Sequence, residues 1–514
     1  MNALPPFSES LGIIDLGSNS ARLLVAHYTP GSVFKVTDEL SRRVRLSEGM
    51  AASQLLTPAA IERALATLRV FASFCKANGV RRVIPVATAA VRDARNQAEF
   101  LQRTQRETGL RLRVLTGEQE AYFSSLGAIN SIGIQQGLVL DVGGGSAELG
   151  KVRAGAFQRG TVKPLGALSL TERFCHTDPI SDADYLALFK YIADTLAPIA
   201  WLRLRNGQQF VGLGGSVRTL ARIDRETRSY PFHLVHQYEL KLGRLEKLID
   251  KLRGLSYKER ARQIAGLRND REDIILAGAM VVAAALRQAS AESLTVCGQG
   301  LREGLLYSQF LRTRRPPVLR NLREFSILNL ARNYSSNQAH ADHVARLSLA
   351  LFDQLSAEHA LGARERECLW AAAQLHDIGT SIDYHNHHKH AAYVILNAAL
   401  PGYTHTEQVT IAALCMLHRR GRAELEAFAP IALLSTSELS NARQMGALLR
   451  LAEYLDRSRS AAVKKVQIRI ADGRAQLLAT PAAVGGATVE ISETQRATDL
   501  FEQEFGMPLS VSIA

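Results

Sequence analysis

Two short segments share a pattern of residue types that suits phosphate binding. Leu11–Ser20 (LGIIDLGSNS) and Gly137–Ser146 (GLVLDVGGGS) are each an apolar run that ends in Asp-x-Gly-x-x-Ser. Glycine lets the backbone bend and approach a phosphate, so that successive amide hydrogens point at its oxygens. The aspartate can hold Mg²⁺ directly or through water, and the serine hydroxyl is a further donor. The repeated pattern indicates an internal duplication with one phosphate-binding turn in each copy.

Two more glycine turns follow apolar runs later in the chain. Val211–Ser216 (VGLGGS) follows Phe210, and Val296–Gly304 (VCGQGLREG) ends a further apolar run. A single turn of this kind is an ordinary connection between a strand and a loop as often as it is a phosphate-binding turn. Two matching turns about one lobe apart, together with the third at Gly214, Gly215 and Ser216, favour a phosphate site.

Hydrolysis of a phosphoanhydride also needs a base for the attacking water and cations for the transferred phosphoryl group. The segment TGEQEA supplies the carboxylates of Glu118 and Glu120, which spacing alone does not distinguish. The segment VATAAVRDARN supplies Arg92 and Arg95, three residues apart and therefore on one face if the segment is helical. Arginine suits this role because its planar fork matches phosphate oxygens.

The elements expected around these residues are those of an α/β protein. Short apolar runs that stop at glycine turns predict buried strands, and the amphipathic Thr57–Ala77 predicts a helix. Ile274–Leu286 is shorter than the roughly 20 residues of a membrane-spanning helix, so it predicts a buried core helix. The pattern stops at Arg312–Arg323, where Pro316 and Pro317 cannot continue a helix. We place a domain boundary there.

Helical periodicity dominates after this boundary. His343–Leu355 and Glu365–Leu375 predict helices, and few β-branched runs interrupt them. Val463–Leu478 alternates around Asp472-Gly473, a dipeptide that provides the positive φ angles of a tight hairpin turn. We therefore expect a helical domain followed by a small α+β domain.

Composition narrows the class of protein without identifying it. The 514 residues suggest about three or four domains. Lys plus Arg exceed Asp plus Glu by 62 − 49 = 13, which favours nucleic acid, an anionic membrane or polyphosphate as a partner, or only solubility. The N-terminus lacks the pattern of a secretion signal, and the five scattered cysteines form no CxxC pair. The expected location is the cytoplasm.

Six segments in order carry a specific resemblance: IIDLGSNSARL, VATAAVRDARN, TGEQEAYFSSLGA, LVLDVGGGSAEL, VGLGGS and CGQGLREG. They resemble the exopolyphosphatase/guanosine pentaphosphate phosphatase family, within the superfamily of acetate and sugar kinases, heat-shock chaperones and actin. The resemblance spans about residues 11 to 310. It implies an α/β fold with two actin-like (RNase H-like) lobes and an active site in the cleft between them, followed by an all-α HD-like domain and a small α+β C-terminal domain. The implied bounds are 1–130 for lobe I, 131–312 for lobe II, 313–430 for the HD-like domain and 431–514 for the last domain.

The resemblance also implies roles for individual residues. Glu120 matches the catalytic base that activates water, and Asp141 and Glu148 match acidic residues near Mg²⁺ and that water. The residues implied to contact phosphate or to line the cleft are Asn19, Ser20, Arg92, Gly144, Gly145 and Ser146. The roles derived from the residues themselves are the same.

The second half of the chain holds residue types that are common in metal sites. His343, His376, Asp377 and Asp456 follow the H…HD…D order of HD-type metal phosphohydrolases, and His and Asp together suit divalent transition ions. The segment HNHHKH alone contains four of the 14 histidines, and His418 follows it. Two interpretations stay open, because these histidines could bind a second divalent metal or could serve packing and polyphosphate contact.

We expect an exopolyphosphatase that uses Mg²⁺ or Mn²⁺ to hydrolyse terminal phosphate from inorganic polyphosphate. The alternative within the class is hydrolysis of guanosine pentaphosphate to the tetraphosphate. A kinase of the same fold and a non-catalytic phosphate-sensing module are further alternatives. We expect no stable nucleic acid partner and no membrane partner, and the resemblance implies a homodimer. Basic residues of the second half could form a track for a long substrate: Arg312, Arg314, Arg315, Lys389 and Arg419.

Overall fold

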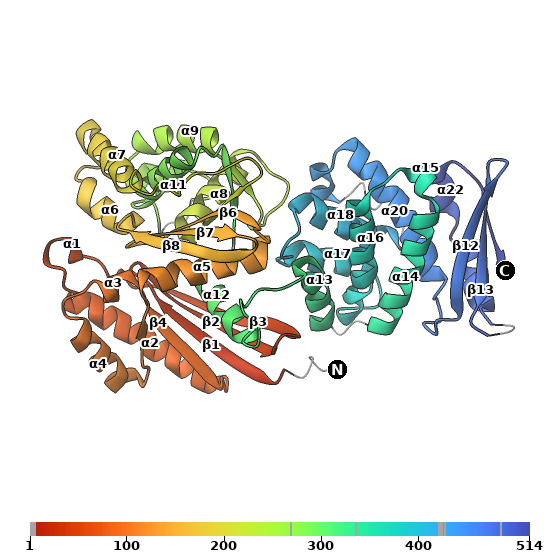
Figure 1. Cartoon of the computed structure of the whole chain (residues 1–514), viewed down its shortest axis with the longest axis horizontal. Coiled ribbons are helices and arrows are strands. Elements are labelled where there is room, and N and C mark those ends of the chain that lie inside the picture. Colours follow the sequence, from red (N-terminus) through yellow and green to blue (C-terminus); the bar gives the residue numbers. More distant parts are fainter. Residues whose placement is uncertain (1–6, 268–269, 335–336, 420–424, 426–427, 484–485) are drawn as a thin grey trace. The chain divides into compact units, whose positions relative to one another are not determined.

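The computed structural model describes residues 7–267, 270–334, 337–419, 425, 428–483 and 486–514. They form two compact units, Phe7–Leu322 and Arg323–Ala514 (Figure 1). The division lies ten residues after the expected boundary at 312/313. The intervening segment stays with the first unit because Asn130, buried in α5 (Gly117–Ile132), donates to the Pro317 carbonyl at 3.1 Å and accepts from the Leu319 amide at 2.8 Å.

A five-stranded sheet forms the first lobe. Its order is β3 (Val33–Arg43), β2 (Ser20–Thr29), β1 (Glu9–Leu16), β4 (Arg82–Ala87) and β5 (Arg113–Val114). The first three strands are antiparallel, and β4 and β5 continue the sheet in parallel. The short helices α1 (Met50–Ser53) and α3 (Ala89–Arg92) and the longer α2 (Pro58–Ala77) and α4 (Gln97–Thr108) complete the lobe.

Helix α2 confirms the helix that the sequence predicts at 57–77. It begins at Thr57, whose side chain accepts a hydrogen bond from the Ala60 amide and so satisfies one of the free amides of the first turn. Its apolar face is buried, including Leu65, Leu68 and Phe71. These side chains pack into one core with strand residues of β1 and β2.

A six-stranded sheet forms the second lobe. Its order is β8 (Ala156–Lys163), β7 (Ala147–Arg153), β6 (Gln136–Val142), β9 (Gln209–Leu213), β11 (Ser293–Val296) and β10 (Glu239–Lys241). The first five strands repeat the arrangement of the first lobe, with three antiparallel strands followed by two in parallel. The two lobes therefore share one topology, which supports the internal duplication predicted from the two Asp-x-Gly-x-x-Ser turns.

The helices of the second lobe are α6 (Ala167–Phe174), α7 (Asp182–Leu196), α8 (Gly214–Thr227), α9 (Leu242–Arg253), α10 (Tyr257–Gln263) and α11 (Ile275–Ala289). Helix α11 carries the longest apolar run and is buried along almost its whole length, as the sequence predicts. Its side chains share one core with strand residues such as Leu138 and Leu140.

Helices α5 and α12 (Leu301–Phe310) cross at very close range (Figure 1). A Cβ at Gly127 of α5 would lie 2.5 Å from the Gly300 carbonyl oxygen, and one at Gly304 of α12 would lie 1.9 Å from the Phe123 carbonyl oxygen. Glycine at both positions allows the two backbones to meet. The crossing fixes the starts of two helices that border the site described below.

The second unit begins with helices and ends with a small sheet. Its helices are α13 (Leu322–Asn333), α14 (Gln338–Gln354), α15 (Ser356–His359), α16 (Ala363–Leu375), α17 (His387–Asn397), α18 (His405–Leu417) and α20 (Thr436–Tyr454), with 3₁₀ turns η1 (Ile378–Ser381) and η2 (Ala429–Leu433). Because α20 packs against α14, α16 and α18, the helical part continues past residue 430 to Tyr454.

The last part combines a three-stranded sheet with two helices. The strands are β12 (Val463–Ala471), β13 (Arg474–Pro481) and β14 (Leu509–Ile513), and the helices are α21 (Thr488–Gln495) and α22 (Asp499–Phe505). The predicted hairpin is confirmed, since Asp472 and Gly473 have φ angles of 50° and 69° between β12 and β13. Among the described residues, no helix combines the length and the apolar composition needed to cross a membrane.

Candidate functional site

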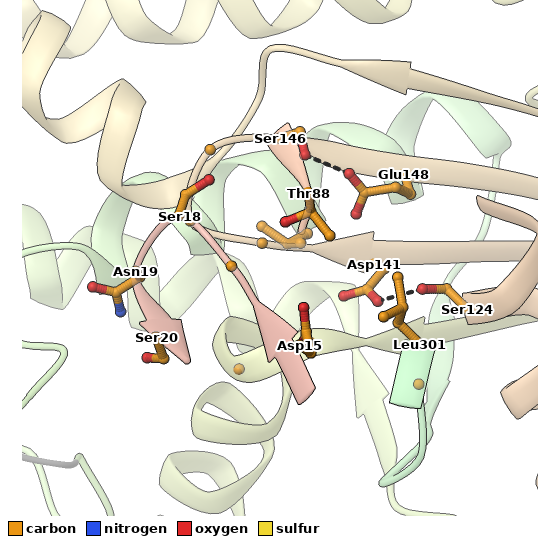
Figure 2. A pocket seen from close by; sticks show the side chains of 18 of the residues that line it. Asp15, Ser18, Asn19, Ser20, Thr88, Ser124, Asp141, Ser146, Glu148 and Leu301 are labelled. Carbon is orange, nitrogen blue, oxygen red and sulfur yellow. Dashed lines mark hydrogen bonds between the residues drawn. The ribbon is translucent and has the colours of Figure 1, made fainter. Parts of the chain in front are cut away.

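The glycine turns of both lobes border one cavity of about 130 Å³ (Figure 2). The first turn joins β1 to β2, and the second joins β6 to β7. Gly17 donates its amide to the Ser20 carbonyl at 3.1 Å, and Gly143 donates its amide to the Ser146 carbonyl at 2.9 Å. The same backbone bond at the same position of both turns shows that the repeated motif folds in the same way in each lobe.

Glycines let the two turns come together. A Cβ at Gly144 would lie 2.8 Å from the Asn19 Cβ, and one at Gly145 would lie 2.4 Å from the Ser18 Oγ. These distances are shorter than real side chains allow. The turns of the two lobes therefore approach closely only because both positions lack a side chain.

Carboxylates gather in the cavity. Figure 2 shows Asp15 and Asp141 projecting into it from strand ends of the two sheets, with Glu148 beside them. Asp141 accepts a hydrogen bond from the Ser124 hydroxyl at 2.8 Å, and Glu148 accepts one from the Ser146 hydroxyl. Asp141 and Glu148 are directly opposite each other in the β6–β7 register, so their side chains share one face of the sheet.

The crowding of these acids changes their proton affinity. Burial raises the pKa of Asp15 to about 6, against the opposing effect of Arg22 and Arg302. Burial also raises the pKa of Asp141, and burial together with the neighbouring Glu120 and Asp141 carboxylates raises the pKa of Glu148. Burial and the neighbouring carboxylates thus disfavour the ionised form of these acids, and a bound cation would favour it.

Four arginines line the same cavity: Arg22, Arg218, Arg271 and Arg302. Arg218 donates to the Gly298 carbonyl at 2.8 Å, which orients its guanidinium. Burial, together with the charges of Arg218 and Arg302, lowers the pKa of Arg22 to about 10, so this guanidinium is still charged at neutral pH. The cavity thus combines oxygen ligands for a metal ion with cations for phosphate oxygens.

Glu120 lies in the first turn of α5. That helix begins at Thr116 with a capping box, in which Thr116 and Gln119 bond each other's backbone amides. The Glu120 side chain is 4% exposed and forms an ion pair with Arg92. Burial, which Arg92 opposes, raises the pKa of Glu120 to about 8. Glu118 is exposed and does not line the cavity, so the structure distinguishes the two acids of the TGEQEA segment.

The structure brings most of the predicted residues together and leaves two outside. The cavity is lined by Asn19, Ser20, Glu120, Asp141, Gly144, Gly145, Ser146, Glu148, Gly214 and Gly215. Ser216 is buried behind it, where a Cβ at Gly278 would lie 2.7 Å from its hydroxyl. Arg92 does not line the cavity and reaches it through its ion pair with Glu120.

Arg92 and Arg95 would share one face only if the segment were helical, and the structure does not meet this condition. Helix α3 ends at Arg92, with Asp93 as its C-cap. Arg95 follows in a turn, where its Nε donates to the Gln54 side chain at 3.1 Å. Only Arg92 is directed to the cavity wall.

Several lining residues were not predicted, although the motifs contain a signal for some of them. Arg22 and Arg218 each lie two residues after the serine of a glycine turn, as the predicted Glu148 does, and all three line the cavity. The duplication likewise makes Asp15 the equivalent of Asp141. The other residues that sequence reasoning missed include Ser18, Thr88, Ser124, Arg271, Arg302 and Glu303.

The histidines of the second unit form groups that differ from the predicted one. Two overlapping sets of possible metal ligands occur among the described residues: His340, His376 and Asp377, and Asp377, His387 and His418. The predicted His343 belongs to neither set. It lies on a partly exposed flank of α14 and accepts from Arg346 at 3.0 Å, whereas His340 lies on the buried face. Asp456 bonds the His340 Nδ1 at 2.8 Å and does not belong to either set.

One member of the predicted basic track is held by a carboxylate. Both Nη atoms of Arg312 bond the Glu9 carboxylate, at 2.8 Å and 2.7 Å. Arg315 donates to the carbonyls of Arg312 and Arg314. These contacts engage the guanidinium groups locally, which makes them weaker candidates for a substrate path.

Comparison with known proteins gives two matches to protein-family models. Residues 24–313 match the Ppx/GppA phosphatase family, and residues 322–482 match Ppx/GppA phosphatase, domain III. The crystal structure of the Aquifex aeolicus member of the Ppx/GppA family is 30% identical, with a TM-score of 0.52 over 60% of this chain and 99% of that chain. An exopolyphosphatase from Cytophaga hutchinsonii is 26% identical, with a TM-score of 0.54 over 59% and 98%. These matches confirm the fold predicted from the sequence.

Proposed function

Since the chain belongs to the Ppx/GppA phosphatase family, we propose that this phosphoanhydride hydrolase is an exopolyphosphatase, which releases terminal phosphate from inorganic polyphosphate with the help of Mg²⁺ or Mn²⁺. A solved structure that is 26% identical belongs to a protein named as an exopolyphosphatase, which is consistent with this substrate. The net charge of +13 also favours a polyanionic partner.

The observation that carries the proposal is the composition of the cavity wall. Among the described residues that line it, nine are charged at their side chains and none is aromatic. The nine are Asp15, Arg22, Glu120, Asp141, Glu148, Arg218, Arg271, Arg302 and Glu303. A wall of charged groups and glycine amides suits the phosphate end that both candidate substrates share.

The acids present fit a hard divalent cation. Asp15, Asp141 and Glu148 offer oxygen ligands, which Mg²⁺ and Mn²⁺ prefer. Burial, with neighbouring carboxylates, raises their pKa values, so a bound cation would favour their ionised form. We expect these three residues to hold the ion. When bound, the ion would supply positive charge beside the oxygens of the phosphate chain.

The protein groups around the ion have separate tasks. The amides of the two glycine turns and the four arginines hold the phosphate oxygens. Glu120 takes a proton from the attacking water, and Arg92 keeps the Glu120 carboxylate in place through the ion pair. Asn19 lines the cavity from the first lobe, and its side-chain NH₂ group donates to the phosphate oxygens.

Hydrolysis of guanosine pentaphosphate to the tetraphosphate is the second candidate. A cavity of about 130 Å³ holds only the end of a phosphate chain, so the rest of either substrate lies outside it. The same base and the same cation would then act on both.

Phosphate release tests the proposal directly. Release is measured from long-chain polyphosphate and, separately, from guanosine pentaphosphate, each with Mg²⁺ and with a chelator. We expect rapid release from the polymer that the chelator abolishes. Preference for the nucleotide would instead assign the protein to the second candidate, and release from neither would refute both.

A Glu120→Gln variant tests whether this cavity performs the reaction. Loss of a general base reduces turnover by about 10²–10⁴-fold. Polyphosphate binding should persist, because the substitution keeps the size and the hydrogen-bonding capacity of the side chain. Unchanged phosphate release would show that another site acts.

The homodimer implied by the resemblance stays a prediction, which sedimentation velocity checks.

A further inference from the structure

The helical unit contains a group of buried polar side chains that the proposed reaction does not use. His376 and Asp377 follow the end of α16, His387 begins α17, and His418 follows the end of α18. The exposed fractions are 0% for His376 and His418, 3% for His387 and 6% for Asp377. Three separate segments of the chain therefore place these side chains together out of contact with water.

Backbone carbonyls set the tautomer of all three histidines. The Nδ1 of His376 bonds the Ala373 carbonyl at 2.8 Å, that of His387 bonds the Tyr384 carbonyl at 2.8 Å, and that of His418 bonds the Cys415 carbonyl at 2.5 Å. A carbonyl oxygen only accepts, so each Nδ1 carries the hydrogen. In the neutral ring the Nε2 then presents a lone pair, and this arrangement is common for histidines that bind metals.

Two of these lone pairs face each other. The Nε2 atoms of His387 and His418 are 3.1 Å apart, and the Asp377 Oδ1 lies 3.4 Å from the Nε2 of His387. Among the described residues this Oδ1 has no hydrogen-bond partner, although it is buried. The other carboxylate oxygen of Asp377 accepts from Arg459 at 2.5 Å.

Such an arrangement is unfavourable without a positive charge in the middle. A buried carboxylate oxygen that lacks a donor costs free energy, and two facing acceptor nitrogens repel each other. A single cation bound to the three atoms would remove both penalties. The separation of 3.1 Å between the two nitrogens also matches the distance between neighbouring ligands of one metal ion, whose bonds to nitrogen are about 2.0–2.1 Å long.

We propose that His387, His418 and Asp377 bind one divalent transition metal ion of the zinc class. Two imidazoles and one carboxylate suit Zn²⁺ or Co²⁺, whereas Mg²⁺ and Mn²⁺ prefer oxygen ligands. The site is separate from the phosphate cavity in its ligands and in its metal preference. It keeps only Asp377 from the set of four that the sequence predicted.

The neighbouring set of His340 and His376 is a poorer metal site. The Oε2 of Glu453 lies 3.0 Å from the Nε2 of both histidines, and Asp456 accepts from the Nδ1 of His340 at 2.8 Å. Each ring nitrogen of these two histidines already bonds an acceptor: a carboxylate oxygen or, for the His376 Nδ1, the Ala373 carbonyl. Hydrogen bonds from the two imidazoles satisfy the Glu453 and Asp456 carboxylates there. We therefore place the metal ion at His387, His418 and Asp377, whose facing acceptor atoms lack donors among the described residues.

Cobalt binding tests the assignment on the whole protein. The chelator-treated chain is titrated with Co²⁺, bound metal is counted after dialysis, and the visible absorption of the cobalt is recorded. We expect one more bound equivalent in the wild type than in His387→Gln or His418→Gln, with an absorption that Zn²⁺ abolishes. The wild type and every variant in this titration also carry Asp141→Asn, which removes a proposed metal ligand of the phosphate cavity. The difference in bound Co²⁺ then reports on the histidine site.

Matched histidine variants separate this site from its surroundings. His343→Gln, on the partly exposed flank of α14, and His340→Gln, in the neighbouring set, should bind Co²⁺ as the wild type does. Loss of the equivalent in His340→Gln with retention in His418→Gln would overturn the assignment. Equal stoichiometry in all variants would also overturn it.

A measurement on the wild type alone covers the case in which a variant does not fold. Zn²⁺ should raise the midpoint of thermal unfolding of the chelator-treated protein, because an ion that binds only the folded state stabilises it. Mg²⁺ at the same concentration should not produce this shift. A wild-type protein that binds no Co²⁺ at the site and shows no Zn²⁺-dependent shift refutes the proposal.

Discussion

Arg92, the last residue of α3, forms an ion pair with Glu120 in the first turn of α5. The Arg92 side chain is 21% exposed and the Glu120 side chain is 4% exposed, and only Glu120 lines the cavity, so the pair lies at its edge. Arg92 also donates to the neighbouring Asp93 at 3.0 Å. We propose a positioning role for Arg92, because it contacts Glu120 and does not itself line the cavity.

Removal of this guanidinium should leave less of Glu120 in the deprotonated, active form at neutral pH. A paired opposite charge lowers a carboxyl pKa by about 1–3 units, so Arg92→Gln should raise the pKa of Glu120 further. We expect kcat/KM at pH 7 to fall by about tenfold or more. The rising limb of the pH profile should shift to higher pH, which a loss of folded protein would not cause.

Arg95→Gln is the matched control for this experiment. It removes the same group three residues later, at an exposed position whose Nε bonds only the Gln54 side chain. Its pH profile should equal that of the wild type. Equal effects of the two substitutions would contradict the role of Arg92.

Activity should depend on pH through Glu120 itself. The base acts when it is deprotonated, and burial raises its pKa to about 8. The active fraction therefore increases as pH rises toward 8, and kcat/KM should fall about tenfold for each unit below this value. Steady-state rates between pH 6 and 9 check this limb. It should be absent from Glu120→Gln, and a flat wild-type profile would contradict the assignment of the base.

The sequence predicted local features well because they depend on short-range patterns. The glycine turns, the helix that begins at Thr57 and the Asp472-Gly473 hairpin each follow from neighbouring residues. Arg271 illustrates what a pattern cannot show. It reaches the cavity from a connection before α11, where a Cβ at Gly215 would lie 2.2 Å from its Nη2. This contact depends on packing between distant segments.

The orientation of α14 about its axis explains why the sequence prediction selected His343 and missed the buried His340. His340 and His343 are both in α14 and three residues apart, and the order of motif residues alone allowed either to be the first histidine. Which of them faces the interior depends on the helices that pack against α14, namely α16 and α20. The sequence therefore showed the H…HD…D order of the motif, but it did not show which of the two histidines in α14 is buried.

The magnesium requirement should depend on Asp141 more than on its neighbour Ser124. Asp141→Asn removes a charged oxygen ligand, so we expect the Mg²⁺ concentration for half-maximal activity to rise at least tenfold. Ser124→Ala removes one hydrogen bond to Asp141, of 2.8 Å, and leaves the carboxylate in place. Its effect should be smaller, since such a bond contributes about 0.5–1.5 kcal/mol. Magnesium titrations of initial rates measure both, and an unchanged requirement in Asp141→Asn would exclude this residue as a ligand.

The close crossing of α5 and α12 makes a prediction about stability. A Cβ at Gly304 would lie 1.9 Å from the Phe123 carbonyl oxygen, which belongs to a helix backbone and cannot move aside cheaply. Gly304→Ala should therefore push the two helices apart, at a cost of about 1–3 kcal/mol or more in the free energy of unfolding. Because Glu120 lies in α5 and Glu303 in α12, activity should fall as well.

Gly243→Ala separates this clash from the general effect of replacing glycine in a helix. Gly243 lies in α9, and a Cβ there would have no neighbour within 4 Å. The substitution should leave activity unchanged and stabilise the protein by about 0.4–1 kcal/mol, since alanine restricts the unfolded chain. Denaturant unfolding of both variants compares the two positions. If Gly304→Ala were as stable and as active as Gly243→Ala, the helix crossing would not require glycine, and the positions of Glu120 and Glu303 would not depend on it.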